Sequence, residues 1–369
     1  MALWKKIRKN RKDKTNKIKK SPRPKSVMIW IDAAYNDQPA RVIRGLALAE
    51  AFCNAGIESV SLSCLACSNL TDEIEKNPKI KWIDSRPNGN PLTFNEIVKV
   101  SAAEIVIADC TTPPRLQPDL NTSLFILLAD EYSDSLFASH RVNAALLPGL
   151  IITPDFEKTE VPASRMADCI HGAQYIPMPD AYYTQTDASP APGHLMIAVS
   201  GNASLEEISP ILDALHPLSK SPITILADVS TDSAKQLQEA YTDNVELLIS
   251  PSLADRMTAI RQASLAIACP GLNILELLAL RKPVIITPRS NQQVKVCQLL
   301  LKQNTVRVTP IADSLDMLKM NVEELLKNEE ERKNLSKQAG DLLDANGSKN
   351  VVDALLTRFA RIELMRKIQ

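Results

Sequence analysis

Residues 263–276 read ASLAIACPGLNILE, which is a short apolar run, a Cys-Pro-Gly turn and a helical pattern that carries Glu276. Residues 279–292 read ALRKPVIITPRSNQ, a second apolar run that ends in a polar turn. Short apolar runs bounded by turn residues are typical of strands that are buried on both faces. The two stretches therefore predict a strand–helix–strand unit with parallel strands.

The same alternation extends to both sides and predicts a doubly wound α/β domain over residues 194–350. The predicted strands are residues 195–199, 223–227, 245–249, 265–268, 284–287 and 306–308. The predicted helices are residues 205–215, 233–241, 253–262, 274–280 and 292–302. Charged helices are expected over residues 313–343, and a C-terminal helix is expected over residues 351–369.

A second series of strands and helices predicts an N-terminal domain over residues 26–180. It opens with the apolar run 27–31, followed by a loop over 32–40 and a helix over 41–55. Further strands are expected at residues 59–65, 104–108, 123–128, 144–147 and 150–153. Proline-rich residues 181–193 predict a linker. The expected class is α/β, with two doubly wound Rossmann-like domains that face each other across a cleft.

The start of the chain is a basic arm on an otherwise acidic protein. Residues 5–25 contain twelve Lys and Arg and one acidic residue, Asp13, whereas the whole chain has 43 basic and 43 acidic residues. We expect residues 1–25 to be a disordered, solvated tail. The alternative is a peripheral anchor on an anionic membrane surface, with Trp4 and Ile7 at the level of the headgroups. Nucleic acid is disfavoured as a partner, because the arm has one aromatic residue and the remaining chain is acidic.

Seven cysteines are scattered through the chain, and their odd number argues against a disulfide framework. We expect reduced thiols in or near the core of a cytoplasmic protein. Cys64 and Cys67 have CxxC spacing without a second pair or a nearby His, so we assign them to the end of a strand and predict no metal and no cofactor. No apolar run of about 18 residues and no secretory signal is found. The expected location is the cytoplasm, with the basic arm allowing a peripheral position at the inner face of the membrane.

Ligands of a doubly wound sheet bind beyond the carboxyl ends of its strands, so the loops at those ends supply the candidate binding residues. A turn before a helix offers backbone N–H groups to a phosphate, and an acidic side chain there can accept hydrogen bonds from ribose hydroxyls. The candidate nucleotide-sugar ligands are Ser200, Gly201, Asn202, Gly271, Asn273, Glu276, Asn291 and Gln292. Two ordinary explanations stay open: Ser204 caps a simple βα turn, and the helix dipole alone favours Glu276 in a first helical turn.

The segment from Ala263 through Glu276 to Ile285 resembles the nucleotide-sugar motif of GT-B proteins, which have two Rossmann-like domains. The resemblance is closest to the nucleotide-sugar hydrolase of pseudaminic acid synthesis and to spore-coat polysaccharide biosynthesis proteins, and more distant to the peptidoglycan N-acetylglucosaminyltransferase. Glu276 falls on the family's ribose-binding Glu, and Asn273 replaces its Thr or Ser. Further matches are Ser200-Gly201-Asn202, Asn291-Gln292 and residues 344–348. The resemblance implies a GT-B fold and a nucleoside diphosphate sugar as the bound molecule.

Residues 32–44 are similar to the family's first loop and helix, but Arg41 stands where the family has a His thought to be catalytic. A guanidinium stays protonated and cannot act as a general base, although it can neutralise a diphosphate or a carboxylate. A base would then have to be a carboxylate of the same loop, for which Asp32 is preferred to Asp37. The candidate catalytic residues are Asp32 and Arg41.

Three functions follow from the resemblance, and whether the chain is an enzyme stays open among them. The first is a glycosyltransferase-like protein that uses a nucleotide-sugar in cell-surface glycan or glycoconjugate synthesis. The second is a nucleotide-sugar hydrolase of nonulosonic (pseudaminic) acid synthesis, against which the missing His weighs. The third is a catalytically inactive binding subunit or scaffold, because fold alone does not fix function.

Overall fold

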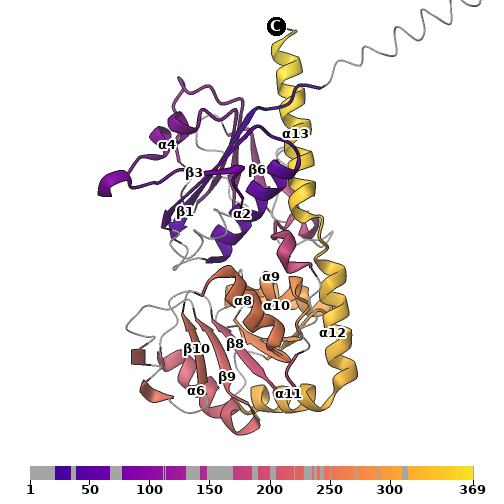
Figure 1. Ribbon diagram of the computed structural model, residues 1–369. Helices are drawn as coiled ribbons and strands as arrows, with labels where there is room; N and C mark the ends of the chain where they lie inside the picture. Colours follow the sequence, from indigo (N-terminus) through magenta and orange to yellow (C-terminus); the bar gives the residue numbers. More distant parts are fainter. Residues whose placement is uncertain are drawn as a thin grey trace, which may run out of the picture.

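The structure is a computed structural model in which the chain forms two α/β domains (Figure 1). The described residues are 21–34, 39–66, 77–110, 112, 114–129, 142–147, 169–184, 190–199, 205–219, 221–227, 235–236, 239–241, 245–249, 251–269, 271, 273–288, 291–309 and 315–368. The basic arm up to residue 20, the predicted strand 150–153 and the loop 200–204 lie outside these ranges.

The N-terminal domain is built on a parallel sheet with the strand order β3-β2-β1-β4-β5-β6-β7. The strands are β1 Ser26–Ala34, β2 Ser59–Ala66, β3 Ile80–Trp82, β4 Ile105–Asp109, β5 Leu124–Leu128, β6 Ala144–Leu147 and β7 Cys169–His171. The helices α2 (Pro39–Asn54) and α4 (Phe94–Ser101) pack on opposite faces. Ile29 of β1 joins the apolar cluster under α2, while its neighbour Met28 joins the cluster under α4. Burial of both faces explains why these strands are almost continuously apolar.

The C-terminal domain has a second parallel sheet, with the strand order β10-β9-β8-β11-β12-β13. The strands are β8 Leu195–Val199, β9 Ile223–Ala227, β10 Val245–Ile249, β11 Leu265–Ala268, β12 Val284–Ile286 and β13 Arg307–Val308. The helices are α6 Leu205–Leu215, α8 Leu253–Gln262, α9 Asn273–Ala279, α10 Asn291–Lys302, α11 Leu315–Lys327 and α12 Glu329–Leu342. Residues 263–286 form β11, α9 and β12, and the prediction of two doubly wound domains is confirmed.

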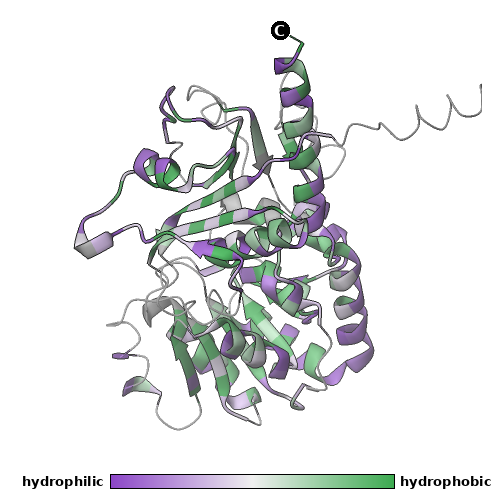
Figure 2. Cartoon of the chain, turned by 45° about the horizontal axis from the view of Figure 1, so that its top comes forward, coloured by the Kyte–Doolittle hydropathy of each residue, from purple (hydrophilic) through white to green (hydrophobic). Residues whose placement is uncertain are grey.

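One apolar cluster continues from the N-terminal domain into the C-terminal domain. It passes through the segment that joins them, where Ile176, Met178 and Tyr182 are buried. Figure 2 shows the strands largely in green and the outward faces of the helices in purple. The shared cluster couples the packing of the two domains.

The last helix, α13 (Gly347–Arg366), leaves the C-terminal domain and packs along the N-terminal domain (Figure 1). Its first turn is fastened to the joining segment, because Ser348 Oγ donates to the Met178 carbonyl at 3.1 Å and Asn350 Nδ2 donates to the Gln174 carbonyl at 2.9 Å. A Cβ on Gly347 would lie 1.9 Å from the Ile176 carbonyl oxygen. This close approach of two backbones requires glycine.

Gly347→Ala is therefore expected to lower the free energy of unfolding by about 1–3 kcal/mol, because the added methyl group forces α13 away from the joining segment. Urea denaturation followed by circular dichroism measures this change. Ala345→Ser, an exposed substitution two residues earlier, should change the stability by less than about 0.5 kcal/mol. Equal stability of the two variants would contradict the close approach.

Some boundaries differ from the sequence-based prediction. β1 continues to Ala34, so Asp32 lies within the strand instead of in the loop after it. β3, α4 and β7 were not predicted, since β3 and β7 have three residues each and offer little periodicity. The cysteines within the described ranges are buried, as expected of core thiols: Cys53, Cys64, Cys110, Cys169, Cys269 and Cys297. Among the described helices, none combines the length and the apolar character needed to cross a membrane.

Candidate functional site

The carboxyl edges of the two sheets face each other where α2 meets α9. Ile43 and Arg44 of α2, together with Leu275 and Glu276 of α9, line a cavity of about 10 Å³ that the joining segment closes at Met178. A cavity of this size holds about one water molecule. The two domains are thus in contact at the point where the sequence predicts a nucleotide.

Glu276 lies in the first turn of α9 and is 1% exposed. Its carboxylate pairs with Arg256 of α8, which is also 1% exposed. The Arg256 Nε lies 2.7 Å from Oε1 and 2.9 Å from Oε2, and Nη2 lies 2.6 Å from Oε2. On the other side, the buried Tyr182 hydroxyl donates to Oε1 at 2.5 Å. Both carboxylate oxygens therefore accept hydrogen bonds from protein donors.

Arg256 and Tyr182 were missed by the sequence analysis. Arg256 had a local signal, because it lies on the same helical face as Leu253 and Ile260, both of which are buried. A cation on a buried helical face requires a buried anion. Tyr182 had no local signal, since it lies 94 residues from Glu276 at the end of a three-residue 3-10 helix, Asp180–Tyr182.

A second buried ion pair lies at the carboxyl edge of the N-terminal sheet. Asp109 ends β4 and is fully buried. Arg44 Nε donates to its Oδ2 at 2.6 Å, and Arg44 Nη2 donates to its Oδ1 at 2.7 Å. Arg41, one helical turn earlier on the same face of α2, brings its Nε to 3.5 Å from Oδ1. Two buried guanidinium groups thus share one carboxylate beside the cavity.

The two candidate catalytic residues lie close to this cluster. Burial raises the pKa of the Cys110 thiol to about 12, and the negative charges of Asp109 and Asp32 add to the rise while Arg41 opposes it. Asp32 and Arg41 therefore both lie close enough to Cys110 for their charges to act on its thiol. The Cys110 thiol is protonated at neutral pH and is no candidate nucleophile. Asp32 is half-buried, whereas Arg41 is buried.

The binding residues that the structure describes gather around the start of α9. Asn273 Nδ2 donates to the Ala198 carbonyl of β8 at 3.2 Å, and its buried Oδ1 has no hydrogen-bond partner within the described residues. The exposed Gly271 accepts a hydrogen bond from the backbone N–H of Ile274 at 3.2 Å. Asn291 and Gln292 begin α10, one strand further along the sheet. Ser200, Gly201 and Asn202 follow β8 directly but lie outside the described residues.

An acidic cluster lies where the joining segment crosses α2. Burial and the nearby charge of Asp180 raise the pKa of Glu50 to about 7. Burial and the charges of Asp344 and Asp180 also raise the pKa of Tyr183. Ionising Glu50 in the folded protein therefore opposes the charge already present on Asp180.

Glu50 is expected to make stability fall as the pH rises from about 4.5 to about 7, because the folded state binds this proton more tightly than the unfolded state. Glu50→Gln removes the titration and should raise the free energy of unfolding at pH 8 by about 1–2 kcal/mol, allowing for solvent screening. Urea denaturation at pH 5 and pH 8 tests this change. Glu58→Gln, at an exposed position nearby, should leave the pH dependence of the wild type intact.

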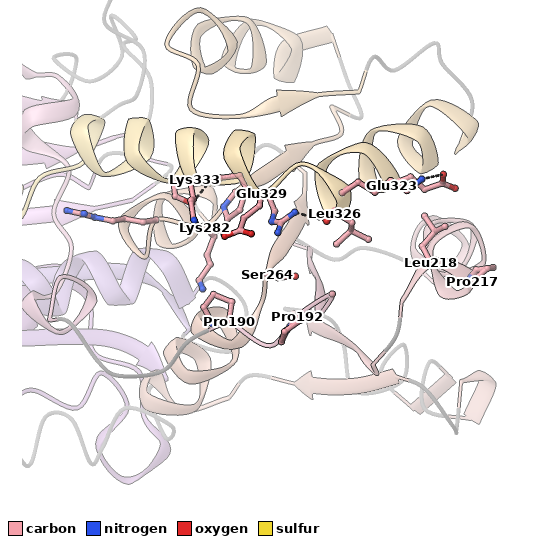
Figure 3. Close-up of a pocket in the computed structure, with 16 residues that line it drawn as sticks. Pro190, Pro192, Pro217, Leu218, Ser264, Lys282, Glu323, Leu326, Glu329 and Lys333 are labelled. Carbon is pink, nitrogen blue, oxygen red and sulfur yellow. Dashed lines mark hydrogen bonds and ion pairs between the residues drawn. The ribbon is translucent and has the colours of Figure 1, made fainter.

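A larger groove of about 930 Å³ lies at the amino ends of the C-terminal strands (Figure 3). Two of its basic side chains, Lys282 and Arg332, donate to backbone carbonyls, and Lys327 and Lys333 pair with Glu323 and Glu329. Lys282 Nζ donates to the Arg261 carbonyl at 2.5 Å and the Ala263 carbonyl at 3.1 Å, and Arg332 Nη1 donates to the Leu326 carbonyl at 2.7 Å. Burial lowers the pKa of Lys282 to about 8. We place the candidate site at the carboxyl edge, where ligands of parallel sheets bind, and not in this larger groove.

No protein-family model matches the chain, and no curated protein matches its sequence. Solved structures do match it. MurG of Acinetobacter baumannii is 15% identical, with a TM-score of 0.51 over 90% of this chain and 99% of that chain. The UDP-GlcNAc 2-epimerase of Neisseria meningitidis, bound to UDP-GlcNAc, is 13% identical, with a TM-score of 0.57 over 90% and 99%.

A glycosyltransferase of Rickettsia africae is 12% identical, with a TM-score of 0.56 over 92% of this chain and 98% of that chain. At this level of identity the likeness defines the fold. The two doubly wound parallel domains and these matches show that the chain has the GT-B fold.

Proposed function

We propose that this chain binds a nucleoside diphosphate sugar at the carboxyl edge of its C-terminal sheet and transfers the sugar to an acceptor in cell-surface glycan synthesis. The observation that carries the proposal is the carboxylate of Glu276 at the start of α9, which Arg256 of α8 holds in place and which lines a small cavity shared with α2 of the other domain. The similar structures of a glycosyltransferase and of an epimerase bound to UDP-GlcNAc support a nucleoside diphosphate sugar as the ligand.

The ligand's diphosphate would lie against the backbone N–H groups at the start of α9 and the loop 200–202. A ribose hydroxyl would donate to Glu276 Oε1, where it would replace the hydroxyl of Tyr182. A ribose needs far more room than the present cavity of about 10 Å³. Binding therefore requires the α2–α9 contact to widen, with the joining segment and Tyr182 moving together.

On the facing domain, Arg41 would neutralise the diphosphate or an acceptor carboxylate. Asp32 would accept the proton of the attacking hydroxyl, since it is half-buried and lies at the carboxyl edge of β1. Asp109 is unsuited to this role, because Arg44 holds its two oxygens.

A thermal-shift panel of uridine, cytidine, guanosine and thymidine diphosphate sugars tests the binding step. A ligand at about 100 times its dissociation constant should stabilise the fold by roughly 2.7 kcal/mol. We expect one base to stabilise the protein more than the others, and the free nucleoside diphosphate to retain much of the effect. If no member of the panel raises the melting temperature, the proposal fails.

Release of the sugar without an acceptor separates transfer from hydrolysis. A transferase should release little sugar until an acceptor is added, whereas a hydrolase of nonulosonic acid synthesis should release it at once. Asp32→Asn should slow either reaction by about 100-fold or more without weakening the binding of the ligand. Asp119→Asn, at an exposed position, is the control.

A second candidate function is a non-catalytic binding subunit. Two observations favour it: an arginine stands at the expected position of the base, and Glu276 is already held by Arg256 and Tyr182. Binding of the nucleotide-sugar without turnover, with any acceptor tried, would support this candidate over the transferase.

A further inference from the structure

We propose that the end of the molecule farthest from the interdomain cleft docks on an anionic lipid membrane, through the last turn of α13 and the amino edge of the N-terminal sheet. This inference is independent of the nucleotide site. Its first support is a cluster of exposed apolar side chains at the end of the helix: Leu364 is 51% exposed, Met365 59% and Ile368 85%. Figure 1 shows this end of α13 projecting beyond the N-terminal domain.

The exposed cluster begins where the packing of α13 on the core ends. The buried apolar side chains of this helix are Val351, Val352, Leu355 and Phe359, and Ile362 packs at the margin of the core. Single exposed apolar residues are common on soluble proteins. Three within five residues, beyond the last core contact, form a compact apolar tip that a lipid surface would cover.

Hydrogen bonds through Glu104 and Ser123 connect the start of the described chain to this tip. The backbone N–H of Lys25 donates to the Glu104 carboxylate at 2.5 Å, and the backbone N–H of Ser123 donates to the Glu104 carbonyl at 2.8 Å. Ser123 Oγ donates to Glu363 at 2.9 Å and accepts from Arg366 at 2.8 Å. The described chain therefore begins at the same edge of the sheet as the end of α13.

The charge of this edge favours an anionic surface. Its exposed cations are Arg23, Lys25, Lys79, Lys99, Arg361, Arg366 and Lys367. Its acidic residues include Glu104 and Glu363, which are engaged by the contacts above, and the exposed Glu58, which directly precedes β2 beside Lys25. Residues 5–20 add ten Lys and Arg and one Asp. Basic residues around apolar side chains suit anionic lipid, because the cations meet the headgroups while the apolar groups enter the interface.

Cosedimentation with vesicles tests the proposal on the full chain. The vesicles are phosphatidylcholine alone, and phosphatidylcholine mixed with phosphatidylglycerol. One variant carries Leu364→Ser, Met365→Ser and Ile368→Ser. The matched control carries Leu315→Ser, Met317→Ser and Met320→Ser on α11, where the side chains are 40%, 37% and 62% exposed. All six positions are exposed, so both variants should melt as the wild type does.

We expect the wild type and the α11 variant to bind the anionic vesicles. Both should bind phosphatidylcholine vesicles at least about tenfold more weakly, because several cation–lipid contacts are lost there. The α13 variant should bind the anionic vesicles about tenfold more weakly than the wild type. Deletion of residues 1–20 should weaken binding further without abolishing the effect of the α13 substitutions. Equal binding by the α13 and α11 variants, or equal binding to both kinds of vesicle, would overturn the proposal.

Discussion

Arg256→Met is expected to lower the free energy of unfolding by about 3–5 kcal/mol, because it leaves the Glu276 carboxylate buried without its partner. Both side chains of this pair are 1% exposed, so water cannot take over the missing hydrogen bonds. The Tyr182 hydroxyl would remain as a donor to Glu276 Oε1 and would offset a minor part of the loss. Urea denaturation followed by circular dichroism measures the change.

The double substitution Arg256→Met with Glu276→Leu is the matched control. Replacing both members of a buried ion pair by apolar groups is often neutral, because the cost of removing two charges from water disappears with them. The double variant should therefore recover most of the stability that Arg256→Met loses. A double variant as unstable as the single one would show that the pair has a role in packing that does not depend on its charge.

Asp109→Leu is the second substitution with a large expected effect, again about 3–5 kcal/mol, because it leaves the guanidinium of Arg44 buried without its bidentate partner. Here the compensating variant should behave differently. Adding Arg44→Met removes one buried cation, but Arg41 also lies 3.5 Å from Asp109 and keeps its charge. We expect recovery to be partial, in contrast to the Arg256–Glu276 pair.

Thermal denaturation at matched pH separates the two cases. Full recovery of stability in the Asp109→Leu, Arg44→Met variant would mean that the buried charge of Arg41 does not need Asp109 as a partner. The triple variant with Arg41→Met should then add nothing. If the recovery is partial, as expected, the triple variant should be more stable than the double one.

Most strands and helices of both domains could be predicted from the sequence because their signals are local. β8, α6, α8 and β11 begin and end at the predicted residues, since apolar runs and helical periodicity are properties of neighbouring residues. The same alternation predicted that the candidate binding residues lie at the carboxyl edge of the sheet. Glu276 lies in the first turn of α9, as expected. Short elements such as β7 carry too few residues for a period.

The partners of the candidate site residues could not be predicted in the same way. Arg256 lies 20 residues from Glu276, Tyr182 lies 94 residues away, and Asp109 lies 65 residues from Arg44. No local pattern specifies which buried charge meets which, because that depends on how the elements pack. The hydrogen bond from Tyr182 to Glu276 depends on how the joining segment packs against α9 and is visible only in three dimensions.

Calorimetric titration of Gly271→Asp against Gly271→Asn tests nucleotide-sugar binding at the start of α9 most directly. Gly271 is exposed and precedes the helix, so the two variants differ there by a carboxylate in place of an amide. That carboxylate would repel a diphosphate. With the nucleoside diphosphate sugar that gives the largest thermal shift, we predict that Asp binds about tenfold or more weakly than Asn, with equal melting temperatures of the unliganded variants. Equal affinities of the two variants, or no binding heat with the wild type, would contradict the account.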